Sequence, residues 1–408
     1  MKCGLLGRKL GHSYSPQIHA LMGNDAYVLI EKEPQEVGPF LRQGDFTGIN
    51  VTIPYKKEVI PFLDELSPVA QRMGAVNTII QRPDGSLFGH NTDYFGFSSM
   101  VKQSEISVAD KKVLVLGSGG ASNTAVKVLE DMGAQVVVIS RTGENNYDNL
   151  YLHKDASVIV NTTPVGMYPN TGVSPIVLSS FPKLEGVLDM IYNPARTKLL
   201  MDATEAGLPC ANGLWMLVAQ AKEAAEYFCG RSLPDDLIER VHLKLSSQMQ
   251  NIILIGMPGC GKSTIAYRLS QKLGRRMVDS DVRITELADK KIPDIFSEDG
   301  ENEFRKWETK ALEELGKQSC LVVATGGGCV TKSRNYRLLH QNGVIFWVRR
   351  DIMHLPVEGR PLSLSGKLDE MYAQRKPMYE AFADYVIDNN GSVDDAVWAI
   401  MSHLEEAI

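Results

Sequence analysis

The chain has 408 residues, of which 44% are hydrophobic and 23% charged, and it carries a net charge of −6 at pH 7. This length exceeds what one hydrophobic core usually supports, so we expect two or three domains. A negative net charge is not typical of a nucleic-acid-binding protein, which usually carries an excess of basic residues. Small anionic ligands must therefore be bound by local clusters of cations.

The six cysteines are scattered and form no Cys-x-x-Cys pair, which argues against a disulfide framework or a zinc site. No apolar run approaches the ~18 residues of a membrane span, and the N-terminus has no signal-peptide pattern. These features predict a cytoplasmic protein that binds neither membranes nor nucleic acid.

Short apolar runs alternate with amphipathic stretches along the chain, which indicates parallel α/β architecture. The first unit, up to residue 97, has candidate strands at 3–6, 26–31, 47–51, 76–81 and 86–89. The second unit has candidate strands at 111–116, 135–139, 157–160 and 186–189, followed by a helix over 211–230. Residues 231–250 predict a short helical linker, and a third α/β unit begins at Asn251.

Polar residues follow several candidate strands of the first unit. Lys56 lies just beyond a strand that Pro54 stops, and the segments 75–78 and 91–93 place Asn, Thr and Asp at two further strand ends. Ser13 and Ser15 add two hydroxyls in an extended turn, although simple helix capping also explains them. Together these groups predict a pocket for a polyhydroxylated molecule, whereas His12 and His19 are interpreted as structural.

A glycine cluster at 117–120 follows a strand and opens a helix. Such a turn lets the backbone approach a pyrophosphate at the helix N-terminus, and an ordinary tight turn is the alternative. The next strand ends at Ser140-Arg141-Thr142, where an NAD site usually places an acidic residue. Arg141 suits a 2′-phosphate instead, so NADP is favoured. The preference can be leaky because no second basic residue stands nearby.

The segment Gly256–Ser263 matches G-x-x-x-x-G-K-[ST] between an apolar strand and a helix. In this loop the backbone N–H groups cradle phosphates, Lys262 neutralises the terminal phosphates and Ser263 ligates Mg²⁺. Cys260, inside the loop, is interpreted as an inert small filler.

Two aspartates, Asp279 and Asp281, follow the next strand. Helix capping is the simplest explanation of such a pair. After a phosphate loop, however, one carboxylate can hold the metal shell while the other accepts a substrate hydroxyl proton.

Further polar groups follow in the last 110 residues. Arg305 and Glu308 are helix-face neighbours, with a surface ion pair as the alternative. The glycines at 326–328 can offer backbone N–H groups to an anion or merely turn the chain. Arg360 and Arg375 can clamp phosphate or carboxylate, or remain solvated.

These motifs together resemble two enzyme families. Residues 1 to about 240 resemble shikimate dehydrogenase through His12–Pro16, Asn50–Lys56, Gly74–Asn77, Asn91–Asp93, the glycine loop, Asn161–Met167, Asp189–Pro194 and Met216–Gln220. Residues 251–408 resemble shikimate kinase through the phosphate loop, Asp279–Asp281, Gly300–Arg305, Gly326–Gly328, Gly359–Leu362 and Arg375–Tyr379. The two activities are successive steps toward aromatic amino acids.

The resemblance implies a fold and a domain order. It implies an α/β substrate domain over residues 1–97 and a Rossmann NADP-binding domain over 98–230, whose last helices pack back on the substrate domain. After the helical linker 231–250, it implies a P-loop parallel α/β domain, like that of nucleoside-monophosphate kinases, over 251–408. The expected assembly is a monomer or a homodimer.

The dehydrogenase resemblance makes Lys56 and Asp93 the catalytic pair in the reduction of 3-dehydroshikimate by NADPH. It assigns substrate contacts to Ser13, Ser15, Thr52, Asn77, Tyr192 and Gln220. It assigns NADP contacts to Gly117, Gly119, Gly120, Ala121, Ser140, Arg141, Thr142 and Gly213.

The kinase resemblance makes Asp281 the group that activates the 3-hydroxyl of shikimate, with Lys262 and Arg360 at the transferring phosphoryl group. Shikimate contacts fall on Asp281, Arg305, Gly327, Gly328 and Arg375. ATP contacts fall on Gly256, Gly259, Cys260, Gly261, Lys262, Ser263, Thr264 and Arg360, and Mg²⁺ contacts on Ser263 and Asp279. The segment 351–359 departs from the family pattern, because it lacks an extra lid arginine that many members carry.

Two other functions stay open at this point. A sensor would bind the metabolites of this pathway without converting them, and it would tolerate the loss of Lys56, Asp93, Lys262 or Asp281. An oxidoreductase acting on quinate with NAD would keep the first site but change its substrate. All four residues are present, which favours the enzyme.

Overall fold

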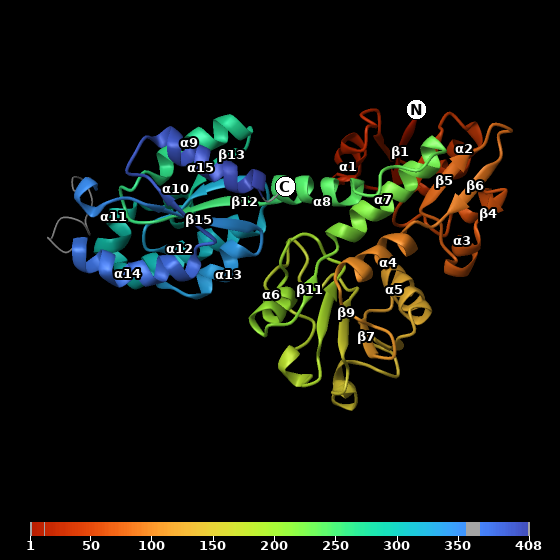
Figure 1. Ribbon diagram of the computed structural model, residues 1–408, viewed down its shortest axis with the longest axis horizontal. Helices are drawn as coiled ribbons and strands as arrows, with labels where there is room; N and C mark the ends of the chain where they lie inside the picture. The colour runs from red at the N-terminus through yellow and green to blue at the C-terminus, as the bar shows by residue number, and fades with distance from the viewer. Residues whose placement is uncertain (1, 12, 356–367, 407–408) are drawn as a thin grey trace. The chain divides into compact units, whose positions relative to one another are not determined.

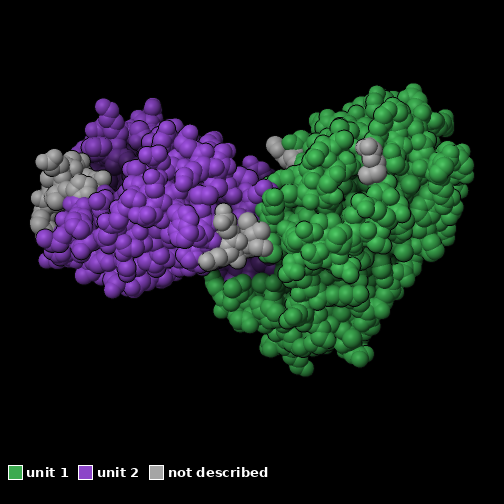
Figure 2. All heavy atoms as spheres, turned by 45° about the horizontal axis from the view of Figure 1, so that its top comes forward, with its two compact units in different colours: residues 1–165, 173–192, 202–245 green, residues 166–172, 193–201, 246–408 purple. Residues whose placement is uncertain are grey.

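The computed structural model describes residues 2–11, 13–355 and 368–406, and Figure 1 traces their order along the chain. The chain forms two compact units, coloured separately in Figure 2. The first contains Met1–Val165, Val173–Tyr192 and Asp202–Leu245. The second contains Gly166–Gly172, Asn193–Met201 and Ser246–Ile408.

A six-stranded sheet forms the N-terminal part of the first unit, in the order β2-β1-β3-β5-β6-β4. Its strands are β1 (Cys3–Gly7), β2 (Val28–Glu31), β3 (Gly48–Val51), β4 (Glu65–Leu66), β5 (Thr78–Gln81) and β6 (Leu87–His90). The helices around it are α1 (Ser15–Leu21), α2 (Pro34–Gln43) and α3 (Pro68–Met73), with the 3₁₀ turn η1 (Ile60–Phe62).

The expectation of parallel strands throughout is wrong for this sheet. Strand β5 runs antiparallel to both β3 and β6. A short hairpin joins β5 to β6: the Arg82 N–H donates to the Ser86 carbonyl, and Gly85 takes a positive φ of 85°. A connection this short cannot make a parallel crossover, which needs a dozen or more residues. The short strand β4 was also missed.

A second, fully parallel sheet has the order β11-β10-β9-β7-β8. Its strands are β7 (Lys112–Leu116), β8 (Gln135–Ile139), β9 (Val158–Asn161), β10 (Gly186–Asp189) and β11 (Cys210–Ala211). The accompanying helices are α4 (Asp93–Gln103), α5 (Gly120–Asp131), α6 (Lys198–Glu205) and α7 (Leu214–Cys229), with 3₁₀ segments η2 (Tyr147–His153) and η3 (Leu178–Ser180). The order reverses between β7 and β9, which is where doubly wound sheets bind dinucleotides.

Helix α7 packs directly on α4. A Cβ on Gly96 would lie 2.8 Å from the Met216 carbonyl oxygen, so only glycine permits this approach. The predicted helix over 211–230 begins three residues later than expected, because Ala211 pairs with Leu188 in the sheet. The contact between α4 and α7 brings the polar end of β6 within reach of α7.

The third sheet is parallel and has the order β13-β14-β12-β15-β16. Its strands are β12 (Asn251–Ile255), β13 (Arg276–Asp279), β14 (Leu321–Ala324), β15 (Gly343–Arg349) and β16 (Tyr385–Asp388). Its helices are α9 (Lys262–Leu273), α10 (Ser280–Ala288), α11 (Ile292–Asp294), α12 (Gly300–Lys317), α13 (Arg334–His340), α14 (Leu368–Phe382) and α15 (Val393–Glu406). Short segments η4 (Ile295–Asp299), η5 (Cys329–Thr331) and η6 (Ile352–His354) complete it. All five residues of β12 are buried, as expected for a central parallel strand.

Helix α8 (Leu237–Met249) lies in the segment that was predicted to be a helical linker. The mixed α/β fold class with a P-loop sheet is confirmed, whereas the boundaries of the four predicted segments stay predictions. Among the described residues, none of the helices combines the length and apolar character that crossing a membrane requires.

Candidate functional site

Lys56 and Asp93 form an ion pair at the ends of two strands of the first sheet. The Lys56 Nζ lies 2.5 Å from the Asp93 Oδ2, and the two side chains are 30% and 18% exposed. The backbone around them is fixed: the Val76 N–H donates to the Lys56 carbonyl, and the Asp93 N–H donates to the Asn91 side chain. The pair is therefore held in place yet open to a ligand.

A polar network surrounds Thr92, the residue that precedes Asp93. The Asn77 Oδ1 accepts hydrogen bonds from the Thr92 N–H at 2.8 Å and from the Thr78 hydroxyl at 3.1 Å. The Thr92 hydroxyl also lies 3.3 Å from the Gln220 Oε1 on α7. The structure thus connects the predicted substrate residues Asn77 and Gln220, which are far apart in sequence. Thr92 joins them, although sequence analysis gave it no role of its own.

The remaining predicted substrate residues lie at the start of α1 and after β3 and β10. The Ser13 hydroxyl donates to the Ser15 hydroxyl at 3.1 Å, and both residues are half-buried. The ring of Tyr14 between them meets the ring of Tyr192 edge-on, at 6.1 Å between centroids. Thr52 is half-buried at the end of β3, where its N–H donates to the Leu6 carbonyl.

The predicted dinucleotide loop lies at the switch point of the second sheet. Gly117 has a positive φ of 111°, and a Cβ there would lie 2.7 Å from the Thr162 Oγ1. Gly119 and Gly120 have no atom within 4 Å of their Cβ positions, and Ala121 beside them is exposed. Gly119 caps the exposed N-terminus of α5. This end of the helix can accept an anion, as a pyrophosphate site requires.

The residues predicted to contact the 2′-phosphate follow β8, and the glycine predicted to meet the nicotinamide precedes α7. Arg141 and Thr142 are exposed beyond the end of β8, and Ser140 is half-buried. Gly213 is buried at the N-terminus of α7, and a Cβ there would lie 2.0 Å from the Met190 carbonyl oxygen. Only glycine fits at that position.

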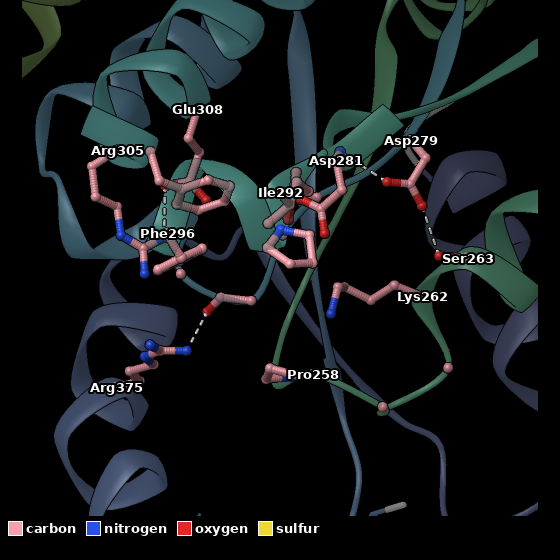
Figure 3. Close-up of a pocket in the computed structure, with 18 of the residues that line it drawn as sticks. Pro258, Lys262, Ser263, Asp279, Asp281, Ile292, Phe296, Arg305, Glu308 and Arg375 are labelled. Carbon is pink, nitrogen blue, oxygen red and sulfur yellow. Dashed lines mark hydrogen bonds and ion pairs between the residues drawn. The ribbon is translucent and has the colours of Figure 1, made fainter. Parts of the chain in front are cut away.

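A cavity of about 610 Å³ opens at the carboxyl edge of the third sheet (Figure 3). Figure 3 shows Arg305 and Arg375 on one side, Lys262 and Ser263 on the other, and Asp281 between them. Apolar side chains that the sequence did not indicate complete the wall, namely Ile292, Pro293, Phe296 and Phe304. Gly259, Gly261 and Thr264 of the phosphate loop also line this cavity.

The phosphate loop is built on glycine geometry. Gly256 and Gly261 have positive φ values of 142° and 101°. A Cβ on Gly256 would lie 2.4 Å from the Val348 carbonyl oxygen, so the loop packs tightly on β15. The Lys262 ammonium donates to the carbonyls of Gly256 and Met257, each at 2.9 Å. Cys260 is fully buried, which fits a small filler.

Asp279 caps α10 and also contacts the phosphate loop. Its Oδ1 accepts the Asp281 N–H at 2.9 Å and so caps α10, while its Oδ2 accepts the Ser263 hydroxyl at 2.9 Å. These two adjacent oxygen ligands at the phosphate loop suit a hard cation such as Mg²⁺.

Asp281 and Glu308 are two further carboxyl groups that line the cavity. Burial raises the pKa of Asp281, and the neighbouring Asp279 raises it further. Glu308 is fully buried, and burial raises its pKa to about 7 although Arg305 lies beside it. Asp281 Oδ1 and Glu308 Oε1 have no hydrogen-bond partner among the described residues. A Cβ on Gly326 would lie 2.7 Å and 3.2 Å from these two oxygens.

Two arginines converge next to these carboxylates. Arg305 pairs with the exposed Glu301 and the fully buried Glu308, each at 2.9 Å. Its ion pair with Glu308 is therefore buried and not the surface pair that was the alternative. Arg375 donates to the Gly327 carbonyl at 3.2 Å. A Cβ on Gly328 would lie 2.2 Å from the Arg305 Nη1, which explains the glycine run. The predicted Arg360 lies outside the described residues.

Comparison with known proteins gives matches for both parts of the chain. Residues 5–79 match the family model of the shikimate dehydrogenase substrate binding domain, and residues 258–405 match that of shikimate kinase. A shikimate dehydrogenase (NADP(+)) from Clostridium perfringens (strain SM101 / Type A) is 36% identical over 264 residues, covering 59% of this chain and 97% of that protein.

Two solved structures are each similar to 60% of the chain. Shikimate dehydrogenase 1 from Peptoclostridium difficile has 37% identity and a TM-score of 0.54, covering 60% of this chain and 98% of that one. A quinate dehydrogenase from Corynebacterium glutamicum in complex with NAD has 28% identity and a TM-score of 0.54, with coverage of 60% and 98%.

Proposed function

Because the chain belongs to the shikimate dehydrogenase family and also carries a shikimate kinase domain, we propose that it performs two consecutive reactions. The first reduces 3-dehydroshikimate to shikimate with NADPH. The second phosphorylates the 3-hydroxyl of shikimate with ATP. The observation that carries this proposal is the presence of two polar centres on one chain, Lys56 with Asp93, and Lys262 with Asp281 and Arg305.

In the first reaction, Lys56 acts on the carbonyl oxygen of the substrate. When bound, NADPH supplies the hydride to the C3 carbonyl carbon. The Lys56 ammonium stabilises the negative charge that develops on the oxygen and donates the proton that completes the hydroxyl. Asp93, 2.5 Å from Lys56, keeps the ammonium oriented and accepts a hydrogen bond from a substrate hydroxyl. The buried Asn77 and the half-buried Gln220, together with Ser13, Ser15, Thr52 and Tyr192, would hold the carboxylate and hydroxyls.

The nucleotide preference rests on the residues after β8. Gly117, Gly119 and Gly120 would receive the pyrophosphate, and Ala121 lies beside them. Arg141, exposed beyond the strand, would pair with the 2′-phosphate of NADP, with Ser140 and Thr142 as further hydrogen-bond partners. The backbone at Gly213 would meet the nicotinamide.

In the second reaction, Asp281 accepts the proton of the shikimate 3-hydroxyl. A raised pKa suits this task, because a base works best when its pKa lies near the working pH. As the hydroxyl oxygen bonds to the γ-phosphorus, the bond to the bridging oxygen breaks and ADP leaves. Lys262 neutralises charge on the phosphates, and Ser263 with Asp279 would hold Mg²⁺, which supplies further charge neutralisation.

The acceptor is held at the opposite side of the cavity. Arg305 and Arg375 would bind the carboxylate of shikimate, with the backbone at Gly327 and Gly328 beside it. By the resemblance, Arg360 would bind the transferring phosphoryl group.

Separate assays of the purified protein test this proposal. NADPH oxidation with 3-dehydroshikimate and ADP formation with shikimate should both occur. The NAD-linked oxidation of quinate should be much slower than the NADP-linked oxidation of shikimate. Binding of both metabolites without conversion of either would establish the sensor function instead, and preferred turnover of quinate with NAD would establish the other oxidoreductase.

A further inference from the structure

Arg350 lines the kinase cavity but was given no role by sequence reasoning. It follows β15 directly, and the same cavity wall includes Gly259, Lys262 and Thr264 of the phosphate loop. The Nε of its guanidinium is buried and has no hydrogen-bond partner among the described residues. The adjacent Arg349 is exposed and pairs with Asp388 at 3.3 Å.

The backbone at Arg350 is fixed against the phosphate loop. The Arg349 carbonyl accepts the Asn389 N–H at 2.8 Å, and the Asp351 N–H donates to the Asn390 side chain at 2.8 Å. The side chain of Asn389 in turn donates to the Cys260 carbonyl within the loop, at 2.7 Å. These hydrogen bonds hold the backbone on both sides of Arg350 next to the phosphate loop.

The other cations of the cavity already have partners. Lys262 donates to two loop carbonyls, Arg305 pairs with two carboxylates, and Arg375 donates to the Gly327 carbonyl. A buried guanidinium N–H without a partner is costly, so its natural partner is an anion that enters the cavity. Phosphate oxygens match the fork of a guanidinium well.

Two anions enter this cavity under the proposed function, the phosphate chain of the nucleotide and the carboxylate of shikimate. The contacts of β15 and of the segment 388–390 with the phosphate loop favour the phosphate chain. The geometry points to Arg350 as a binding residue for a phosphate oxygen of ATP and ADP. This inference rests on the proposed kinase function and adds a fixed cation to the nucleotide side of that site.

Substitution of the two adjacent arginines tests it. Arg350→Ala removes the cavity guanidinium, Arg350→Lys keeps only a point charge, and Arg349→Ala is the matched control that removes the same charge one residue away. Binding of MgADP and of AMP is measured by titration calorimetry on the full chain, without shikimate. The KM values for ATP and shikimate are measured in parallel, with NADPH oxidation as a check on folding.

We expect Arg350→Ala to weaken MgADP binding and raise the KM for ATP at least tenfold. Arg350→Lys should recover part of the loss, and Arg349→Ala should stay within twofold of the parent. A smaller effect on AMP than on ADP would place the contact beyond the α-phosphate, and an equal effect would place it at the α-phosphate.

Two results would overturn the inference. One is an Arg350→Ala protein that binds MgADP as the Arg349→Ala control does, and the other is a rise in the KM for shikimate alone. Because ADP binding is measured without the acceptor, failure of the parent to phosphorylate shikimate would refute the proposed kinase reaction separately.

Discussion

The predicted dehydrogenase centre and the kinase cavity differ in how their polar side chains are paired. Lys56 and Asp93 already neutralise one another, and Asn77 is hydrogen-bonded to its neighbours. In the kinase cavity, buried atoms of Asp281, Glu308 and Arg350 have no partner in the described part of the chain.

Polar groups of a binding site can thus be paired with one another before the ligand binds, or left without a partner until it binds. A paired centre costs little to bury, but its substrate has to replace or share internal hydrogen bonds. A cavity with unpaired groups loses stability until its ligands arrive, and it should gain more from binding them. Substitution of single residues tests whether the dehydrogenase centre behaves as a paired site and the kinase cavity as an unpaired one.

The largest effect is expected at the ion pair. Lys56→Ala should slow NADPH oxidation with 3-dehydroshikimate about 10³-fold, because the developing alkoxide loses both its charge partner and its proton donor. ATP-dependent phosphorylation of shikimate should stay unchanged. The control is Lys57→Ala, which removes the adjacent exposed lysine. Loss of both activities in the Lys56 variant would mean that the two centres are not independent.

Asp281→Asn should slow phosphoryl transfer about 10²-fold, because an amide cannot take the hydroxyl proton. The KM for shikimate should change far less than kcat, since the amide still makes a hydrogen bond. Asp289→Asn, at the exposed C-cap of α10, is the matched control. An unchanged kcat would show that Asp281 is not the base.

Glu308 should make the stability of the kinase part depend on pH. Its pKa of about 7 in the folded state lies above the ordinary 4.5, so the folded chain binds more protons between these two pH values. Stability should therefore fall as the pH rises from about 4.5 to 7. Glu308→Gln should remove this loss, which amounts to roughly 3 kcal/mol at pH 8.

The measurement is the pH dependence of the thermal transition that MgADP shifts, compared between the parent and the Gln variant. The variant should gain stability relative to the parent as the pH rises. A parent that becomes more stable from pH 4.5 to 7 would contradict the raised pKa and show that pairing with Arg305 outweighs burial.

The smallest effect is expected at Arg141. Arg141→Ala should raise the KM for NADPH about tenfold and leave the KM for NADH almost unchanged, because only the 2′-phosphate loses a partner. Kinase activity with the same preparation is the folding control. Equal losses for both nucleotides would assign Arg141 to another part of the cofactor.

Much of the two sites follows from short sequence patterns. Gly117 and Gly256 adopt positive φ values inside glycine-rich loops, and each loop joins a buried strand to a helix as expected. The polar residues after β3 and β6 meet because strand ends share one edge of the sheet. Such features depend on the conformation of a few neighbouring residues, so the residue types in the sequence are enough to predict them.

Other features depend on packing between distant segments. The burial of Glu308 requires α12 to lie against the glycines of residues 326–328. The sequence offered its pairing with Arg305 only as a surface ion pair, so the burial of this pair was not predicted. The antiparallel course of β5 depends on the hairpin to β6. Asp388 pairs with Arg349 and not with the adjacent Arg350, and the sequence does not indicate which of the two arginines it pairs with. The Nε of Arg350 has no partner among the described residues.

The central claim, two independent and consecutive reactions on one chain, is tested most directly by complementation. Lys56→Ala and Lys262→Ala proteins are assayed alone and mixed, with 3-dehydroshikimate, NADPH and ATP, for the formation of shikimate 3-phosphate. Each protein alone should form almost none, and the mixture should form it after a lag while free shikimate accumulates. A mixture that stays inactive, although each variant keeps its other activity, would contradict this account.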